Sequence, residues 1–283
     1  MNLRPKEEFM GLRIQTNVAS ITAQNKLSKQ QNRAEHAMAA LASGSRIVNA
    51  SDDAAGLSIS ENLKGQIRGI QMARQNANNA VSLIQVSEGG LNEINNILIR
   101  LRELGVQAAS DTVSDVERGF LNQEATQLIQ EADRIAKTTM FGNKPLLDGS
   151  GEELEFHVGP FGGEDNIIRY EISADATGST IGYDSIDLSD KEGARDTLQI
   201  VDESIVELGN LRADFGAVQS RLNTTVANLD IQNENLSAAN SRIRDADVAH
   251  ETSELASANI LQQASVGVLA QANQFPQSAL RLL

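Results

Sequence analysis

The chain has 283 residues, carries 24 Lys and Arg against 38 Asp and Glu for a net charge of −14, and contains neither Cys nor Trp. This acidic balance argues against nucleic acid and anionic membrane surfaces as partners, because both attract basic proteins. The lack of Cys excludes disulfides and thiolate sites, and no apolar run is long enough to predict a transmembrane helix. Aromatic residues make up only 3% of the chain, while Ala, Ser, Asn and Gln abound, which favours long helices with narrow apolar seams over a thick globular core.

Residues 1–9 are charged and contain Pro5, which is typical of a short lead-in without regular structure. Met10 is an alternative start, and mass spectrometry of the native N-terminal peptide would decide between the two. The N-terminus lacks the apolar core of a signal peptide. Any export is therefore expected to follow a route without such a signal.

Residues 11–43 are polar and compatible with one helix that carries two short apolar stripes. An Ala in place of a Leu on such a stripe gives up about three CH₂ groups, or roughly 2.4 kcal/mol of burial free energy. The helix is therefore too weakly apolar to be stable alone and needs partners. The first stripe contains Ile14, Val18 and Ile21, and the second contains Leu27, Ala34, Met38 and Leu41.

A polar segment at residues 44–56 interrupts the helical pattern. Gly44 can end the first helix, and Ser51 or Asp52 can cap the next one. We interpret the Asp52–Asp53 pair as capping and turn chemistry rather than as an acid–base pair, because short polar side chains prefer helix caps and turns.

Residues 70–108 carry an unbroken alternation of three- and four-residue spacings between apolar or small residues. Such a helix has a narrow apolar seam, spans roughly 60 Å, and needs a partner helix along its whole length. Gly89 and Gly90 lie off this seam and cost about 1 kcal/mol each relative to Ala, so we expect a tolerated weak point there. Apolar residues off the seam, including Leu104, predict contact with more than one neighbour. The seam residues predicted to pair the rods are Ile84, Leu91, Ile94 and Leu98.

A turn is predicted at 110–113, followed by a shorter amphipathic helix at 116–137. Period-two alternation at 154–158 and 167–172, separated by a Gly-rich turn, then predicts a β-hairpin. Residues 173–191 have the composition of a loop.

A second long seam follows at 194–236, and we expect it to be the antiparallel partner of the first. Its pairing residues are predicted to be Leu208, Phe215, Leu222 and Leu229, which recur every seven residues. From residue 245 the chain is again rich in Ala, Gln and Ser, with a thin seam in which Leu261, Val268 and Phe275 are the large members, and Pro276 should bend or end that helix. The predicted fold is mainly α, with long antiparallel helical coiled-coil rods and a small β-hairpin region at the tip.

The two weak terminal helices are expected to pair with each other and still to expose a seam that pairing within one chain cannot satisfy. The simplest inference is that copies of the protein cover this seam for one another. The predicted polymerisation seam consists of Ile14, Val18, Ile21, Leu27, Leu41, Leu261, Val268 and Phe275.

No catalytic constellation is evident. His36, His157 and His250 lie in three different predicted elements without the spacing of metal ligands. The sequence also lacks a P-loop or a dinucleotide-binding Gly pattern. We therefore predict no enzyme activity, no metal site and no cofactor.

Several ordered motifs resemble those of the bacterial flagellins. The similarity covers about residues 10–148 and 195–283. The motifs are Ile14-Gln15-Thr16-Asn17, Ser43-Gly44-Ser45-Arg46-Ile47, Asp52-Asp53-Ala54-Ala55-Gly56, Asn76-Ala77-Asn78-Asn79, Glu88-Gly89-Gly90-Leu91-Asn92-Glu93-Ile94, Leu101-Arg102-Glu103-Leu104, Ile260-Leu261-Gln262-Gln263-Ala264 and Leu269-Ala270-Gln271-Ala272-Asn273-Gln274.

This resemblance implies a subunit that self-assembles into the extracellular flagellar filament, the propeller of bacterial motility. Residues 10–45 and 240–283 would form the inner coiled-coil domain that lines the filament core. Residues 46–239 would form a surrounding helical rod domain with a β-region at about 140–193. The chain would be a short form without the variable outer domains of many members.

The resemblance also implies partners. Export would use the flagellar type III apparatus and a dedicated chaperone that binds about residues 240–283, and assembly would involve filament cap and hook-junction proteins. Some flagellins are sensed by an animal Toll-like receptor. The positions that match that surface are Arg100, Leu104 and Glu124, which we expect to face solvent in the subunit and to make axial contacts in the filament.

Two other functions remain as alternatives. A hook–filament junction protein shares the terminal heptads and the export route, but it would cap at fixed copy number. A cytoplasmic signalling coiled coil of the chemoreceptor type is also rich in Ala and Gln, but it would have no reason to carry these ordered terminal motifs.

Overall fold

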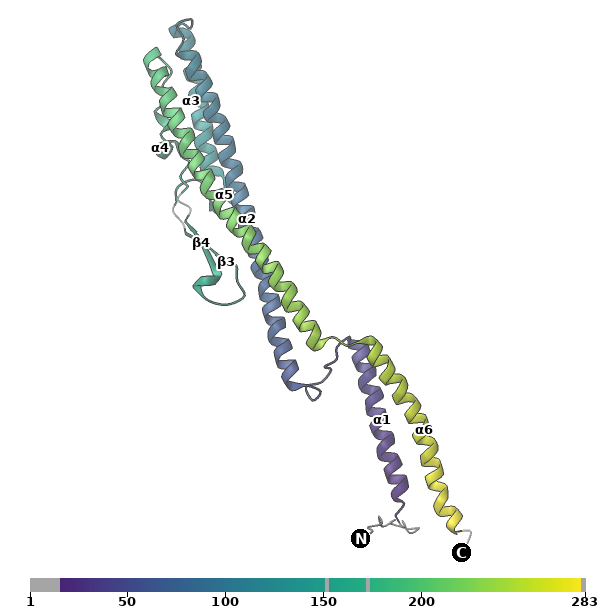
Figure 1. Cartoon of the computed structure of the whole chain (residues 1–283). Coiled ribbons are helices and arrows are strands. Elements are labelled where there is room, and N and C mark those ends of the chain that lie inside the picture. The colour runs from purple at the N-terminus through teal and green to yellow at the C-terminus, as the bar shows by residue number, and fades with distance from the viewer. Residues whose placement is uncertain (1–15, 151–152, 172–173, 281–283) are drawn as a thin grey trace, which may run out of the picture. The chain divides into compact units, whose positions relative to one another are not determined.

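A computed structural model describes residues 16–150, 153–171 and 174–280, and most of them are helical (Figure 1). The predicted fold class is confirmed. The chain divides into two compact units, which we name the terminal unit (Met1–Lys64 and Ser237–Leu283) and the rod unit (Gly65–Leu236). The long helices are α1 (Val18–Ser43), α2 (Ala54–Ala108), α3 (Asp115–Thr138), α5 (Lys191–Arg244) and α6 (Val248–Leu280).

Each long helix begins at a short polar side chain that accepts a hydrogen bond from the first turn, as N-caps do. The cap of α2 is Asp53, whose Oδ1 accepts from the Gly56 N–H at 2.8 Å, and not Ser51 or Asp52 as predicted. Asp52 instead accepts from the backbone N–H groups of Val48 and Asn49, which is turn chemistry. The other caps are Asn17, Ser114, Asp190 and Asp247.

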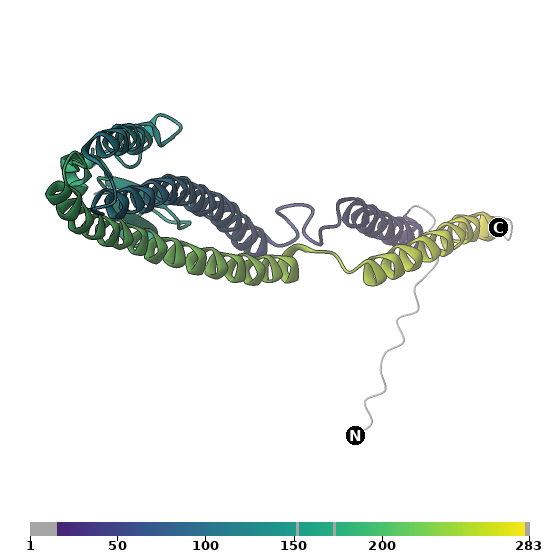
Figure 2. The ribbon, with the colours of Figure 1, turned by 90° about the horizontal axis from the view of Figure 1, so that it is seen from above.

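Within the rod unit, α2 and α5 lie side by side and run antiparallel (Figures 1 and 2). Three ion pairs between the helices show how they are aligned. From one pair to the next, the residue number rises in α2 and falls in α5, as expected for antiparallel helices. The pairs are Arg74–Asp230 at 2.8 Å, Glu88–Arg212 at 4.0 Å and Arg102–Asp202 at 2.7 Å.

The shorter helix α3 returns along α2 after the predicted turn. Arg118 fixes this turn: its buried guanidinium donates to the Ala108 carbonyl at 2.9 Å and to the Ser110 carbonyl at 3.0 Å. It thereby satisfies carbonyl groups that the end of α2 leaves without an intrahelical donor. Arg118 is also paired with Asp115 at 2.6 Å.

Two small antiparallel strand pairs follow α3. The predicted hairpin is confirmed as β3 (Glu153–His157) and β4 (Ile167–Glu171), which are joined through a short 3₁₀ helix, η1 (Glu164–Asn166). Its predicted position at the tip of the rods is wrong, because the His157 carbonyl accepts from Asn76 of α2 at 3.1 Å, far from the turn that follows Ala108. A second pair, β1 (Met140–Phe141) and β2 (Lys144–Pro145), was not predicted. Tyr170 stacks at a tilt on Phe215 with ring centres 5.6 Å apart, and so attaches the hairpin to α5.

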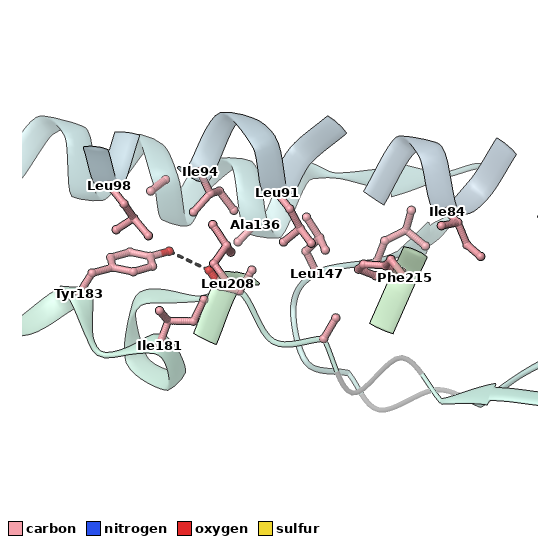
Figure 3. Packing of buried hydrophobic residues seen from close by; sticks show 14 of the residues in the cluster. Ile84, Leu91, Ile94, Leu98, Ala136, Leu147, Ile181, Tyr183, Leu208 and Phe215 are labelled. Atoms are coloured by element: carbon pink, nitrogen blue, oxygen red, sulfur yellow. Dashed lines mark hydrogen bonds between the residues drawn. The ribbon is translucent and has the colours of Figure 1, made fainter. Parts of the chain in front are cut away.

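The segment after the hairpin is part of the core, which corrects its interpretation as a loop. It holds α4 (Gly178–Ile181) and a 3₁₀ turn, η2 (Tyr183–Ser185). Figure 3 shows Ile181 and Tyr183 facing Leu98 and Leu208, with the Tyr183 hydroxyl donating to the Ala176 carbonyl at 2.8 Å. The buried side chains of this segment cover the seam between the long helices.

In the terminal unit, α1 lies beside α6, and the buried apolar side chains of the two helices are alanines. The breaks that precede α2 and α6 are held together by backbone hydrogen bonds, from Arg46 N–H to the Arg244 carbonyl at 2.7 Å and from Ala246 N–H to the Gly44 carbonyl at 3.0 Å. Gly44 ends α1 in the left-handed conformation (φ 69°), as predicted.

Helix α6 does not end at Pro276 but continues to Leu280. Pro276 has no N–H to donate to the carbonyl four residues earlier, which is that of Ala272. The side-chain amide of Asn17 donates to this carbonyl instead, at 2.8 Å. A contact from α1 therefore replaces the hydrogen bond that the proline removes.

Candidate functional site

The three histidines do not converge. His36 lies 3.2 Å from Asp52 beside the break after α1, whereas His157 is in β3 and His250 in the first turn of α6. In the part of the chain that the structure describes, no three His, Asp or Glu residues lie close enough together to hold a metal ion. Within the same residues, no helix is sufficiently long and apolar to cross a membrane. The candidate functional surface consists of exposed apolar side chains on α1 and α6.

The interface between α1 and α6 is lined by alanine. Ser20 Oγ donates to Asn273 Oδ1 at 2.8 Å and adds a polar contact at the end of the pair. Alanine buries little apolar area, so this pairing is weak for its length. The buried apolar residues of the two helices are Ala23, Ala34, Ala37, Ala40, Ala258 and Ala272.

Large apolar side chains of the same two helices point to solvent. Val18, Ile21 and Val268 are 50%, 51% and 59% exposed, and Leu261 is exposed as well. Leu27 and Leu41 are half-buried. Ile14 and the side chain of Phe275 lie outside the described residues. The structure thus leaves Val18, Ile21, Leu261 and Val268 exposed. Leu27 and Leu41, each four residues after a buried alanine (Ala23 and Ala37), lie instead on the helix face that carries the alanine interface.

The eight residues predicted to pair the rods are all buried. Figure 3 shows Ile84, Leu91, Ile94 and Leu98 on one side of the core, with Leu208 and Phe215 on the other. Leu222 belongs to the same apolar cluster, whereas Leu229 packs with Ile70 and Ala73 in a smaller one.

The three positions that resemble a receptor surface differ in their exposure to solvent. Arg100 and Glu124 are exposed and form an ion pair at 2.8 Å, and the carboxylates of Glu103 and Glu124 raise the pKa of the Arg100 guanidinium. Leu104 is only 1% exposed, so the expectation that it faces solvent is wrong. It belongs to the large apolar cluster of the rod unit, together with Leu101 one turn earlier.

Two groups of residues that hold the rod unit together were not predicted from the sequence. From the sequence, Arg118 is expected to be an ordinary surface residue, yet its guanidinium group joins the end of α2 to α3 by hydrogen bonds. Four buried residues of the segment after the hairpin were also missed, because polar residues lie between them in the sequence. An apolar residue at every second or third position could have predicted their burial. They are Ile181, Tyr183, Ile186 and Leu188.

Charge is divided unequally between the two units. The rod unit holds 13 Lys and Arg against 28 Asp and Glu, a net charge of −15, whereas the rest of the chain holds 11 against 10. Some of the acidic side chains of the rod unit form ion pairs with basic ones. In one such pair, the Arg102 guanidinium lowers the pKa of the Asp202 carboxyl. The terminal unit is therefore nearly neutral in net charge, and several of its large apolar side chains are exposed.

Comparison with known proteins agrees with this geometry. Residues 14–152 match the family described as the bacterial flagellin N-terminal helical region, and residues 198–283 match the bacterial flagellin C-terminal helical region. A flagellin of Halalkalibacterium halodurans is 41% identical over 271 residues, which cover 95% of this chain and 99% of the relative. A flagellin of Bacillus subtilis is 41% identical over 303 aligned residues, covering 96% of this chain and 100% of the relative.

A solved structure described as a putative flagellar hook-associated protein from Vibrio parahaemolyticus has a TM-score of 0.58, covering 69% of this chain and 100% of that one. It is 12% identical, so this likeness concerns the fold alone. The two family regions occur in the expected order, and the relatives at 41% identity span nearly the entire chain. The chain belongs to the bacterial flagellins, the structural subunits of the flagellar filament.

Proposed function

We propose that this filament subunit polymerises through the large apolar side chains that α1 and α6 leave exposed. The observation that supports it is the combination of an alanine interface within the pair and half-exposed Val18, Ile21 and Val268 outside it. Burying the rest of one such side chain yields about 1 kcal/mol. Association costs at least roughly 4 kcal/mol, so no single residue suffices and the set must act together.

Within the filament, residues 10–45 and 240–283 form the inner layer and residues 46–239 surround it. The near-neutral charge of the terminal unit supports this arrangement, because charged rods repel one another less at a larger radius. The mechanical role follows from the α2–α5 pair, whose long continuous helices stiffen each subunit of a propeller that a rotary motor turns.

Seeded assembly tests the proposal. Purified chains are added to short filament fragments, and growth is followed by negative-stain electron microscopy. The double variant with Ile21→Ser and Leu261→Ser should prevent elongation, whereas Val206→Ser, which changes an exposed residue of α5, should leave it intact. Short caps without elongation by the unmodified chain would instead indicate a hook–filament junction protein.

Export through the flagellar type III apparatus, with a chaperone bound to about residues 240–283, belongs to the same proposal. Val248, Ile260 and Val266 of α6 are exposed and would need protection before assembly. Coexpression with the cognate chaperone should yield a complex with the full chain but none with a chain that ends at residue 239. Equal binding of both would contradict this role of α6. Filament cap and hook-junction proteins would meet the subunit at the ends of the filament.

Recognition by an animal Toll-like receptor would use the exposed Arg100–Glu124 pair, without Leu104 as a direct contact. In reporter cells, Arg100→Ala should weaken signalling by monomer, whereas Arg134→Ala, which removes a comparable exposed ion pair on α3, should not. An undiminished signal from Arg100→Ala would exclude this surface.

A further inference from the structure

All of the sulfur in this chain is in methionine, because the sequence contains five Met and no Cys. Three of these methionines lie in the described residues, and each is about half exposed: Met38 of α1 at 55%, Met72 of α2 at 57% and Met140 of β1 at 47%. Peroxides oxidise exposed thioethers, and here no thiol competes for the oxidant. Oxidants of sulfur therefore act on this chain at methionine.

Met38 differs from the other two by its position beside the α1–α6 interface. It lies one turn after the buried Ala34 and one turn before the half-buried Leu41, so the three side chains share a face of α1. The pairing with α6 buries the neighbouring Ala37 and Ala40 but leaves more than half of the Met38 side chain exposed. Met38 therefore lies where the alanine interface meets the open surface of the pair.

Met38 is also the one exposed apolar residue of this surface that an oxidant can change. Helix α6 contains no Met, and α1 contains Met38 alone. The aliphatic side chains of Val18, Ile21 and Val268 have no group that a peroxide attacks. The polarity of the surface formed by α1 and α6 can therefore be altered after folding at Met38.

The reaction is the transfer of one oxygen atom with two electrons. The Met38 sulfur attacks one oxygen of hydrogen peroxide, the O–O bond breaks as the S–O bond forms, and the second oxygen leaves as water. The sulfur is oxidised and the peroxide is reduced. The sulfoxide is polar and accepts hydrogen bonds. Water solvates it in the free subunit, but burying it among apolar side chains without a donor opposes association.

Met72 and Met140 provide the same chemistry at other places. Met72 lies between the buried Ile70 and Ala73 in the sequence of α2, but its own side chain is exposed, and Met140 belongs to the short strand pair after α3. Their exposed fractions are close to that of Met38, so a peroxide should oxidise all three in the monomer. Because neither lies on α1 or α6, their sulfoxides should not impede assembly through that surface.

We propose that Met38 is a redox-sensitive modification site, at which a peroxide oxidises the free subunit and blocks its addition to the filament. This inference rests on the proposed polymerisation through α1 and α6. The block is reversible, because methionine sulfoxide reductases return the sulfoxide to the thioether with two electrons from a dithiol and release of water. Subunits already in the filament are protected, because assembly covers Met38.

Two variants separate Met38 from the other methionines. One carries Met72→Leu and Met140→Leu and keeps Met38, the other carries Met38→Leu alone, and both keep Met1 and Met10. Leu replaces Met with little change in volume, so both untreated variants should extend seeds normally. Monomers are treated with hydrogen peroxide, freed of it, and added to untreated seeds, and peptide mass spectrometry reports the oxidation of each methionine.

In the variant that keeps Met38, peroxide should raise the critical concentration for seeded growth roughly tenfold or more, with monomer helicity unchanged by circular dichroism. Methionine sulfoxide reductases of both stereospecificities, supplied with dithiothreitol, should restore the original value. The same treatment of the Met38→Leu variant should leave its critical concentration nearly unchanged. In filaments, Met38 should be oxidised much more slowly than in monomer.

An unchanged critical concentration with Met38 fully oxidised would overturn the inference, and so would an equal rise in the Met38→Leu variant. Equal rates of Met38 oxidation in filaments and monomer would overturn it as well, because assembly would then not cover the side chain. In each of these cases, seeds that untreated chains extend would leave the proposed function intact. Failure of untreated chains to extend seeds would remove both.

Discussion

Two adjacent glycines in α2 show that the effect of a substitution depends on the atoms around the residue. Gly89 and Gly90 are equivalent in sequence terms, since both lie off the seam. In the structure, a Cβ on Gly89 would meet open space, whereas one on Gly90 would lie 2.8 Å from both Leu147 Cδ1 and Thr139 Oγ1. The expected weak point therefore applies to Gly89, while Gly90 permits the segment after α3 to approach α2 closely.

We expect Gly89→Ala to stabilise the protein by about 1 kcal/mol, because Ala has the better helix propensity and meets no atom. Gly90→Ala should destabilise it by about 1–3 kcal/mol, because the added methyl overpacks the core. Urea unfolding of the monomer followed by circular dichroism would measure both. Equal effects of the two substitutions would contradict this account of Gly90.

The two tyrosines provide a second prediction about single residues. Burial raises the pKa of Tyr170 to about 12, with a further contribution from Asp214, and burial also raises the pKa of Tyr183. An unfolded tyrosine titrates near 10, so the folded chain holds these protons more tightly. The stabilisation is complete below about pH 10 and is lost as the pH rises toward 12.

Absorbance of phenolate should therefore appear together with alkaline unfolding rather than near pH 10. The measurement is clean because the chain has two Tyr and no Trp. Titration near pH 10 with the helices intact would show that the rings are accessible in the folded state.

Among the elements, α1 and α6 depend on each other through Asn17. Its Oδ1 caps α1 by accepting from the Ser20 N–H at 3.1 Å, and its Nδ2 donates to the Ala272 carbonyl that Pro276 leaves without a donor. One side chain thus serves the start of one helix and the end of the other.

Asn17→Asp keeps the cap and removes the amide donor, whereas Asn17→Ala removes both. Asn17→Ala should cost about 1–2 kcal/mol at the start of α1 through the lost cap. Both variants should increase hydrogen exchange near the end of α6, but only Asn17→Ala should do so in the first turn of α1. Unchanged exchange in α6 for both would mean that the Asn17 donor contributes nothing there.

The rods present a contrasting case, because their pairing is apolar and continuous. Leu91, Ile94 and Leu98 are buried against α5 and the segment that contains Tyr183, while the ion pairs that mark the register are exposed. Exposed pairs contribute less than about 1 kcal/mol each. The apolar seam therefore stabilises the pair, and the charges select its register.

For the chain in full, the uneven charge distribution predicts how assembly depends on salt. Rod units of net charge −15 repel one another when subunits pack side by side. Because salt shortens the screening distance to about 8–10 Å at physiological strength, the critical concentration for seeded growth should fall as NaCl rises from low levels. Pelleting assays would measure it. Replacing Glu203 and Glu207 with Gln should flatten the dependence, and a critical concentration that rises with salt would contradict it.

Weak pairing of the terminal helices predicts a second property of the free subunit. Residues 10–45 and 240–283 should be cleaved first in limited proteolysis of monomer and should be protected in filaments, because only assembly buries their larger apolar side chains. Mass spectrometry of the fragments would locate the cuts. Full protection in the monomer would show that α1 and α6 are stable without partners.

Some features follow from sequence because they depend on local spacing. The seams of α2 and α5, the end of α1 at Gly44 and the β3–β4 hairpin were predictable from periodicity and glycine chemistry alone. The flagellin family was predictable as well, since its motifs occur in order at both ends of the chain.

Tertiary structure decided what depends on contacts between distant segments. Leu104 is buried within the apolar cluster of the rod unit, and Tyr183 joins that cluster because its segment covers the rod seam. Helix α6 continues through Pro276 where Asn17 supplies a donor. The periodicity of one helix specifies which face is apolar, but it does not specify which neighbour covers that face. Sequence by itself therefore determined the helices, their seams and the family, while the three-dimensional arrangement decided which apolar side chains are buried and which stay exposed.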